Sequence, residues 1–177
     1  MTGKRLAAVD ARGLQQRRAD NLNYTRLFYM PGVAPLDVRW DVKENLIYAA
    51  CSDGTVRVFD GNGRALATLA GHQDWVYCVA LSADGTRVAS GSGDGTVKLW
   101  NTADNKLLAT LVQLSPRAED WLIVTDQGYL ATSSPGEIQW KTANVKTPVD
   151  QITAVLEKPE LVQKAIAGEK NDAPALE

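Results

Sequence analysis

The sequence predicts an all-β chain built from repeated four-stranded antiparallel sheets, followed by a short helical segment. Three observations support this prediction. Residues 76–111 contain four strand-like runs separated by turn residues, among them Asp94-Gly95, a pair that tolerates the positive φ angles of a two-residue hairpin. The same pattern stands 41 residues earlier in the chain. Residues 148–168 instead place their apolar side chains at helical spacing.

The segment 71–101 defines the repeating unit, because its strands and turns follow one another without a gap. Apolar and other residues alternate after Val76 as they do in a half-buried strand, and the Ala-Asp-Gly sequence at 83–85 provides a tight turn. β-Branched and aromatic residues follow Asp94-Gly95 and predict a third strand. The four strands are expected at residues 76–82, 87–92, 96–100 and 107–111.

Comparison of the sequence with itself identifies a second unit before this one. Residues 52–60 (SDGTVRVFD) match residues 93–101 (GDGTVKLWN) at a shift of 41. Its first two strands are expected at residues 36–40 and 46–51. We therefore expect one complete unit at residues 33–69 and a second at residues 70–111.

The opening residues fit the same unit in a weaker form. Residues 3–7 lie over residues 85–89 at twice the repeat distance, and Arg12-Gly13 then overlies Asp94-Gly95. Strands are expected at residues 14–18 and 24–30. This partial unit, residues 3–32, begins at its second strand and has no inner strand.

A second partial unit is expected after residue 111, at residues 112–141. Residues 121–125 and 129–133 predict two strands around a turn, and residues 137–141 predict a third strand that ends near Trp140.

The strand pattern ends after residue 141, and residues 146–168 predict a helical segment. Pro159 is suited to begin a second short helix, and Gly168 is suited to end it. This segment is expected either to bind a partner or to pack on the last sheet. The polar and small residues 169–177 are expected to be a disordered tail.

Residues 71–111 closely resemble a WD40 repeat. The resemblance depends on Gly71-His72 at the start, Asp94-Gly95 in the second hairpin, and Trp100-Asn101 where the family usually has Trp-Asp. It implies an all-β fold: a WD40-type β-propeller segment of about two full and two partial four-stranded blades, with a short C-terminal helical appendage. Blades of this family surround a central channel, and most members bind other proteins.

A closed propeller usually has four to eight blades, and the strands missing from the two partial blades do not complement one another. Two explanations stay open: two copies self-associate to complete one ring, or the chain is the C-terminal part of a larger propeller. The last blade also resembles the end of bacterial WD-repeat proteins that are often fused to caspase-like or other effector domains. The main expectation is a non-catalytic scaffold for protein–protein interaction. The alternative is a regulatory or sensor fragment of such a bacterial effector.

The resemblance also implies a buried structural hydrogen-bond network. In the family it joins the histidine of Gly-His, a serine of the second strand, the aspartate of the second hairpin and the tryptophan of the third strand. These positions are His72, Ser90, Asp94 and Trp100. His72 is the only histidine, so a catalytic triad would have to include it. We expect a structural role for His72 and no enzymatic activity.

Candidate partner-binding residues follow from their position before and within the inner strand. In WD40 rings this region faces the rim that meets partners, which implicates Asp74, Trp75 and Tyr77. Aromatic side chains there are suited to anchor a partner, because they supply a large contact area at little entropic cost. The alternative is that Trp75 packs between blades. A weaker alignment places Leu36, Asp37 and Asp120 at neighbouring rim positions.

Composition excludes several other classes. The chain has 45% apolar and 23% charged residues and a formal net charge of −2, so no strong field draws it to nucleic acid or a membrane. Its apolar runs are too short to span a bilayer, its first residues lack a secretory signal, and a cytoplasmic location is expected. No residue spacing suits zinc or calcium, so no metal or cofactor is expected. Cys51 and Cys78 are expected to be buried free thiols.

Overall fold

The computed structural model describes residues 5–10, 13–18, 24–28, 30–114, 119–134 and 149–174. Antiparallel strands form most of the regular structure, and the described helices both lie near the C-terminal end of the sequence. This confirms the predicted all-β fold class with a small helical part. The chain divides into two compact units. The first unit comprises Met1–Gly95 and Trp100–Lys106, and the second comprises Thr96–Leu99 and Leu107–Glu177.

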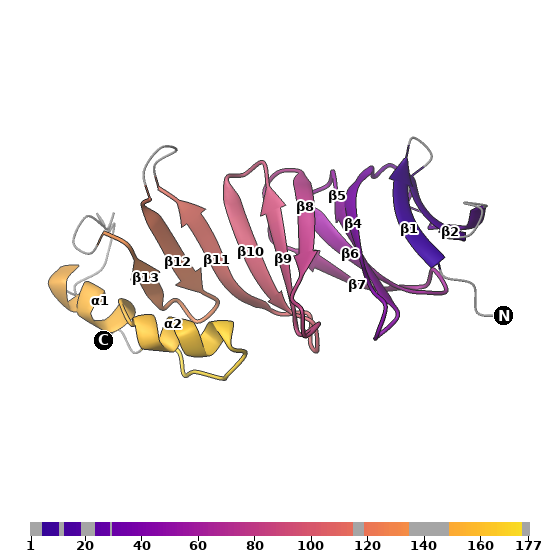
Figure 1. Cartoon of the computed structure of the whole chain (residues 1–177). Helices are drawn as coiled ribbons and strands as arrows, with labels where there is room; N and C mark the ends of the chain where they lie inside the picture. Colours follow the sequence, from indigo (N-terminus) through magenta and orange to yellow (C-terminus); the bar gives the residue numbers. More distant parts are fainter. Residues whose placement is uncertain are drawn as a thin grey trace. The chain divides into compact units, whose positions relative to one another are not determined.

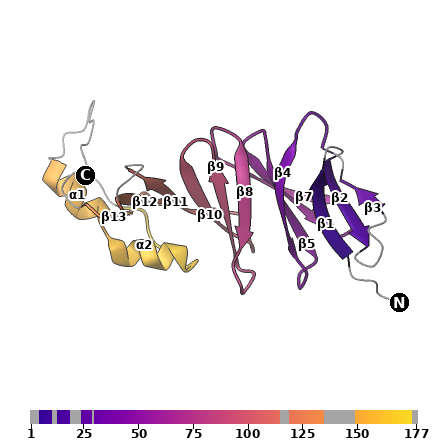
Figure 2. The ribbon, with the colours of Figure 1, turned by 45° about the horizontal axis from the view of Figure 1, so that its top comes forward.

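The first unit contains two separate sheets and a further hairpin. Its strands are β1 (Arg5–Asp10), β2 (Gly13–Arg18), β3 (Tyr24–Leu27), β4 (Pro35–Asp41), β5 (Leu46–Cys51), β6 (Thr55–Asp60), β7 (Ala65–Ala70), β8 (Val76–Leu81) and β9 (Arg87–Ser92). One sheet has the order β1-β2-β3 and the next has the order β4-β5-β6-β7 (Figure 2). β8 pairs with β9, and β8 also lies close to β4 (Figure 1).

One hydrophobic core cluster of the first unit lies between the β1–β3 sheet and the β4–β7 sheet. Leu14 and Phe28 come from the first of these segments, and Ile47 and Phe59 come from the second. The rings of Phe28 and Phe59 meet edge to face, with centroids 5.3 Å apart. Neighbouring sheets therefore bury each other's apolar faces, as stacked repeats must do to form a continuous core.

The two inner strands, β4 and β8, share an irregularity. The pairing register shifts between Pro35 and Asp37 in β4, and it shifts between Val76 and Cys78 in β8. These positions are 41 residues apart, so the bulge recurs with the repeat. A β-bulge adds one residue to one strand and interrupts the alternation of its side chains between the two faces of the sheet.

The bulge in β8 corrects one expectation from the sequence. Simple alternation places Cys78 on the same face as the buried Val76, whereas the structure buries Val76 and Val79 and leaves Tyr77 and Cys78 exposed. Cys51 is buried and both cysteines are free, as expected. The prediction that Cys78 is buried is therefore wrong.

Two glycines in equivalent hairpin turns allow a matched stability test. Gly54 and Gly95 have φ angles of 79° and 81°, values that are strained for any other residue. A Cβ atom at Gly95 would have no neighbour within 4 Å, but at Gly54 it would lie 3.1 Å from the carbonyl oxygen of His72 and 3.3 Å from that of Asp74. We expect Gly95→Ala to lower the free energy of unfolding by about 1 kcal/mol and Gly54→Ala by about 2 kcal/mol.

Urea unfolding of the two variants checks this order. Equal losses would show that the φ angle alone decides the cost, and that the close approach of the β5–β6 turn to residues 72–74 has no energetic consequence.

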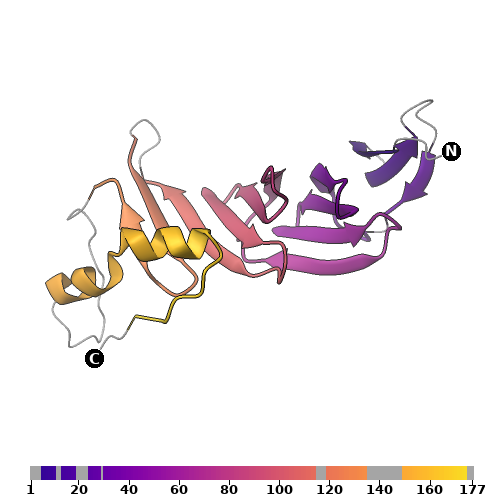
Figure 3. The same ribbon diagram turned by 60° about the horizontal axis from the view of Figure 1, so that its bottom comes forward.

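The second unit consists of strands covered by helices. Its elements are the first residues of β10 (Thr96–Asn101), β11 (Leu107–Gln113), β12 (Trp121–Thr125), β13 (Leu130–Thr132), α1 (Val149–Leu156) and α2 (Pro159–Ile166). β12 lies between β11 and β13, and the ammonium group of Lys98 in β10 donates a 2.9 Å hydrogen bond to Thr110 Oγ1 in β11. α2 lies against β11, β12 and β13 (Figure 3).

Apolar side chains attach both helices to the strands. Val162 of α2 packs with Tyr129 and Ala131, and Leu156 of α1 packs with Leu130. The backbone N–H of Lys158 donates to the carbonyl oxygen of Leu130 at 3.1 Å, close to the start of α2. The amphipathic pattern of residues 148–168 thus corresponds to a helical pair that covers the last described strands.

Some expectations fall outside the described residues or stay untested. The predicted strand at residues 137–141, with Trp140, lies outside them. The division into blades, the two partial ones included, remains a prediction, as does the disorder of the tail. Residues 169–174 of that tail form no helix or strand, and Asn171 Nδ2 donates a 2.8 Å hydrogen bond to the carbonyl oxygen of Leu161.

Candidate partner-binding site

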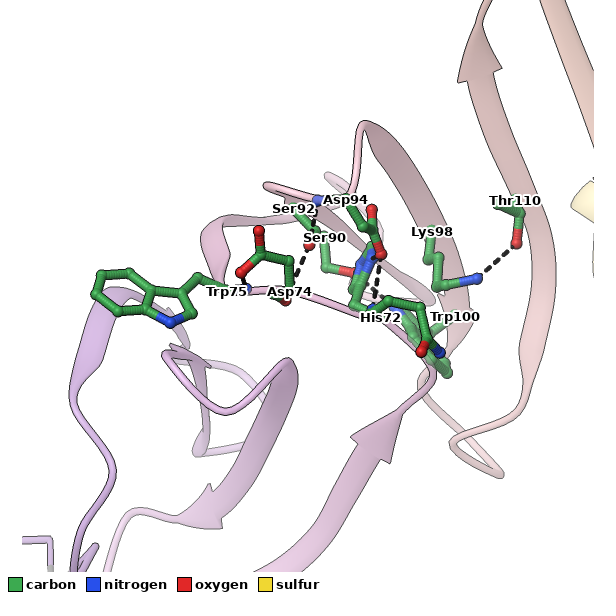
Figure 4. Close-up of polar contacts among 10 residues, drawn as sticks. His72, Asp74, Trp75, Ser90, Ser92, Asp94, Lys98, Trp100 and Thr110 are labelled. Carbon is green, nitrogen blue, oxygen red and sulfur yellow. Dashed lines mark hydrogen bonds and ion pairs between the residues drawn. The ribbon is translucent and has the colours of Figure 1, made fainter.

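The candidate site is the loop before β8 together with the first residues of that strand. Four side chains joined by hydrogen bonds hold this loop in place. His72 Nδ1 lies 2.9 Å from Asp94 Oδ2, His72 Nε2 lies 2.8 Å from Ser90 Oγ, and Trp100 Nε1 donates a 2.9 Å hydrogen bond to Ser90 Oγ (Figure 4). The structure therefore brings His72, Ser90, Asp94 and Trp100 together in one continuous hydrogen-bonded chain.

Chemistry fixes one proton position in this chain. The indole of Trp100 can only donate, so Ser90 Oγ accepts its hydrogen. The two ring nitrogens of His72 lie within hydrogen-bonding distance of Ser90 Oγ and Asp94 Oδ2, and which of them donates depends on the tautomer of the imidazole. Asp94 Oδ2 also accepts the backbone N–H of Gln73 at 2.9 Å, which ties the loop directly to the β9–β10 turn.

Asp74, Trp75 and Tyr77 form a separate, exposed group, which we call the rim surface. Trp75 is 49% exposed and Tyr77 is 56% exposed, and their ring centroids lie 6.2 Å apart at an interplanar angle of 56°. In Figure 4 the indole of Trp75 points away from the His72 chain.

Backbone and side-chain hydrogen bonds hold the rim surface in place. Ser92 Oγ donates to the carbonyl oxygen of Asp74 at 3.0 Å, and the N–H of Gly93 donates to the carbonyl oxygen of Trp75 at 2.9 Å. A Cβ atom at Gly93 would lie 2.9 Å from Asp74 Oδ2 and 3.1 Å from Tyr77 Cε2. Glycine at position 93 therefore makes the room in which the carboxylate and the tyrosine ring lie beside each other.

Asp37, which is expected at a neighbouring rim position, makes contacts with two strands of the first unit. Its Oδ2 accepts the backbone N–H of Val79 at 3.0 Å, and its Oδ1 pairs with Arg39 at 2.8 Å. Asp37 thus links β4 to β8. The sequence carries a signal for this, because Asp37 is a charged residue between two apolar neighbours and occupies the repeat position of Cys78.

The hairpin turn of the β4–β7 sheet carries an ion pair instead of a histidine chain. Arg57 lies 2.9 Å from Asp53 Oδ2, and Thr55 donates to Asp53 Oδ1 at 2.6 Å. Burial raises the pKa of Asp53, but the hydrogen bonds from Thr55 and Arg57 outweigh burial and hold this pKa below its ordinary value. Asp53 and Asp94, which align in the repeat, therefore stabilise equivalent turns through different partners.

The environments of the two cysteines predict different reactivities. Burial raises the pKa of the Cys51 thiol to about 11, so almost none of it is thiolate at pH 8, whereas the Cys78 thiol is exposed. We expect iodoacetamide at pH 8 to modify one thiol per folded chain, and Cys78→Ser to abolish the fast reaction. Because the Cys51 pKa is raised, the reactivity of this thiol should increase only as the pH approaches 11. Fast modification of two thiols in the native protein would contradict the assignment.

Little in the described residues suggests chemistry at a metal or a nucleophile. No group of three or more His, Cys, Asp or Glu side chains among them could hold a metal ion. Both ring nitrogens of His72 are already engaged, one with Ser90 and one with Asp94. The geometry of this region is suited to rigid presentation of a surface.

Comparisons with known proteins support the WD40 resemblance. Residues 32–60 and 63–101 match the family model of the WD domain, G-beta repeat. These residues are therefore similar to WD40 repeats, and they include the β4–β7 sheet and the whole His72 chain.

Several curated proteins are similar to this chain. It is 26% identical over 147 residues to the eukaryotic translation initiation factor 3 subunit I of Lodderomyces elongisporus, covering 76% of this chain and 42% of that protein. It is 39% identical over 67 residues to the transcription factor unc-37 of Caenorhabditis elegans, covering 37% and 11%. It is 35% identical over 77 residues to the WD repeat-containing protein 1 of Xenopus tropicalis, covering 41% and 13%. The chain thus spans less than half the length of each of these relatives.

These relatives are described as an initiation factor subunit, a transcription factor and a WD-repeat protein, and none is described as a peptidase. The bacterial effector alternative therefore receives no support from them. Within the part of the chain that the structure describes, no helix has the length and apolar character to cross a membrane.

Proposed function

We propose that this chain, which has segments similar to WD40 repeats, is a non-catalytic scaffold that binds another protein through the rim surface of Asp74, Trp75 and Tyr77. One observation carries the proposal: two adjacent aromatic side chains are about half exposed, and the loop that presents them is fixed by the buried chain through His72. Large aromatic side chains dominate the energetics of many protein interfaces. An anchor that is already ordered loses little conformational entropy on binding.

The similar proteins support this class of function. One of them is described as a subunit of a translation initiation factor, and a subunit works in contact with other proteins. We transfer only this general role to the present chain. The proposal includes a cytoplasmic location, which a fluorescent fusion would check. Self-association to complete a ring is a second form of protein binding, and the solution mass of the purified chain separates a monomer of 19.2 kDa from a dimer.

Site-specific photo-crosslinking tests the proposal. We would place p-benzoylphenylalanine at Trp75 and, as a matched control, at Leu66, an outer-strand residue with the same 49% exposure. The Trp75 position is expected to give a discrete crosslinked partner in cells, and the Leu66 position is expected to give none.

The affinity of that partner for single variants then measures the contribution of each ring. We expect Trp75→Ala to weaken binding about 30-fold, the change that corresponds to loss of about 2 kcal/mol at an interface hot spot. Tyr77→Ala should weaken binding to a similar degree, and Leu66→Ala should change the affinity less than about twofold. Unchanged affinity of both aromatic variants would refute the proposed site.

A further inference from the structure

The rim surface contains a carboxylate whose charge is not balanced within the described residues. Asp74 Oδ1 accepts the backbone N–H of Trp75 at 2.7 Å, and no ion pair of the described residues involves Asp74. Two other aspartates of the first unit, both in hairpin turns, have partners. Asp53 pairs with Arg57, and Asp94 contacts His72 and accepts a hydrogen bond from Gln73.

The aromatic rings beside this carboxylate are placed to contact the same incoming group. Asp74 Oδ2 and Tyr77 Cε2 both lie close to one point above Gly93, and the Trp75 ring lies next to Tyr77. Trp75 and Tyr77 both leave about half of their surface accessible. A ligand that reaches this point meets a negative charge and aromatic surface together.

The side chain of arginine can pair with the carboxylate and also contact the aromatic rings. The guanidinium group of arginine is planar and always charged, stacks on aromatic rings, and pairs with a carboxylate through directed N–H groups. Lysine supplies the charge but neither the planar face nor the fork of donors. A phosphate or an acidic side chain would be repelled by Asp74, which argues against an acidic or phosphorylated partner and against nucleic acid.

We infer that the rim surface recognises an arginine side chain of its protein partner, with Asp74 pairing with the guanidinium, one of the two aromatic rings packing against its plane and the other contacting its edge. This inference rests on the proposed function and specifies the chemistry of the partner. It requires no step in which a bond is formed or broken.

A peptide titration of the full chain tests it. The probe is the acetylated and amidated peptide Gly-Gly-Arg-Gly-Gly, compared with peptides that carry lysine or citrulline in place of arginine. Citrulline keeps the planar shape but removes the charge. The readout is the indole N–H signal of Trp75 in ¹H–¹⁵N spectra, identified among the five tryptophans by its absence in Trp75→Phe.

We expect the arginine peptide to shift the Trp75 signal and to bind roughly fivefold more tightly than the citrulline peptide, with lysine intermediate. Asp74→Asn should reduce the affinity for arginine roughly fivefold and remove its dependence on salt. The control is Asp172→Asn, which removes the same charge from an exposed residue of the second unit and should leave the titration unchanged.

Other results would overturn the inference without touching the proposed function. These are equal shifts from the arginine and citrulline peptides, an unchanged titration in Asp74→Asn, or a response of Trp75 to an oligothymidylate and not to arginine. In each case, a crosslinked partner that still depends on Trp75 would keep the scaffold proposal intact. Loss of that dependence, by contrast, would refute the proposed function itself.

Discussion

Replacing His72 with alanine is expected to lower the free energy of unfolding by about 3 kcal/mol. The substitution removes the hydrogen-bond partner of Ser90 Oγ and one partner of Asp94 Oδ2, both in a region that is largely closed to water. A buried polar group that loses its partner costs about 1 to 3 kcal/mol, and a charged group costs more. Since His72 is the central member of the chain, its loss affects both neighbours at once.

Urea denaturation followed by circular dichroism measures this loss. Gln73→Ala is a matched control, because Gln73 is exposed and contributes its backbone N–H, not its side chain, to the bond with Asp94. We expect this control to stay within about 0.5 kcal/mol of the parent protein. A His72→Ala variant as stable as Gln73→Ala would mean that the hydrogen-bonded chain does not stabilise the fold.

The strands could be predicted from the sequence because their signals are local. Asp-Gly turns, period-two alternation and the shift of 41 residues identify β9 with the bounds 87–92 and β5 with the bounds 46–51, as the structure has them. The chain through His72 depends on residues far apart in sequence. Its members follow from the family resemblance, because no periodicity in this chain alone relates His72 to Ser90.

The exposure of Cys78 could not be predicted, since it depends on register. The bulge between Val76 and Cys78 is a property of the pairing between β8 and β9, and the residue types of β8 (VYCVAL) do not predict it. Without the bulge, alternation would turn Cys78 inward. The helices illustrate a different limit: their apolar stripes predict that a surface is covered, either on a partner or on the last sheet, but the choice between the two and the contact of α2 with β11 come from tertiary packing.

The second large effect is expected at α2, where Val162→Asp should detach the helix from the strands it covers. Val162 is 2% exposed and packs against Tyr129 and Ala131. An ionised carboxylate has no described cation to pair with among these neighbours, and an uncompensated buried charge costs about 3 to 5 kcal/mol. That cost exceeds what a helix of eight residues gains from its own hydrogen bonds. We therefore expect the helix to detach from the strands, because burying the charge would require more free energy than exposing the helix.

Undocking has a consequence that global unfolding does not share. The apolar faces of β12 and β13 would become accessible while the first unit keeps its fold, so the variant should bind more of the dye ANS and exchange the amide hydrogens of residues 122–125 and 130–132 faster. Gln163→Asp is the matched control, because it adds the same charge at the next residue, which is exposed. We expect that variant to behave like the parent. Equal ANS binding and exchange in the two variants would show that α2 does not protect these strands.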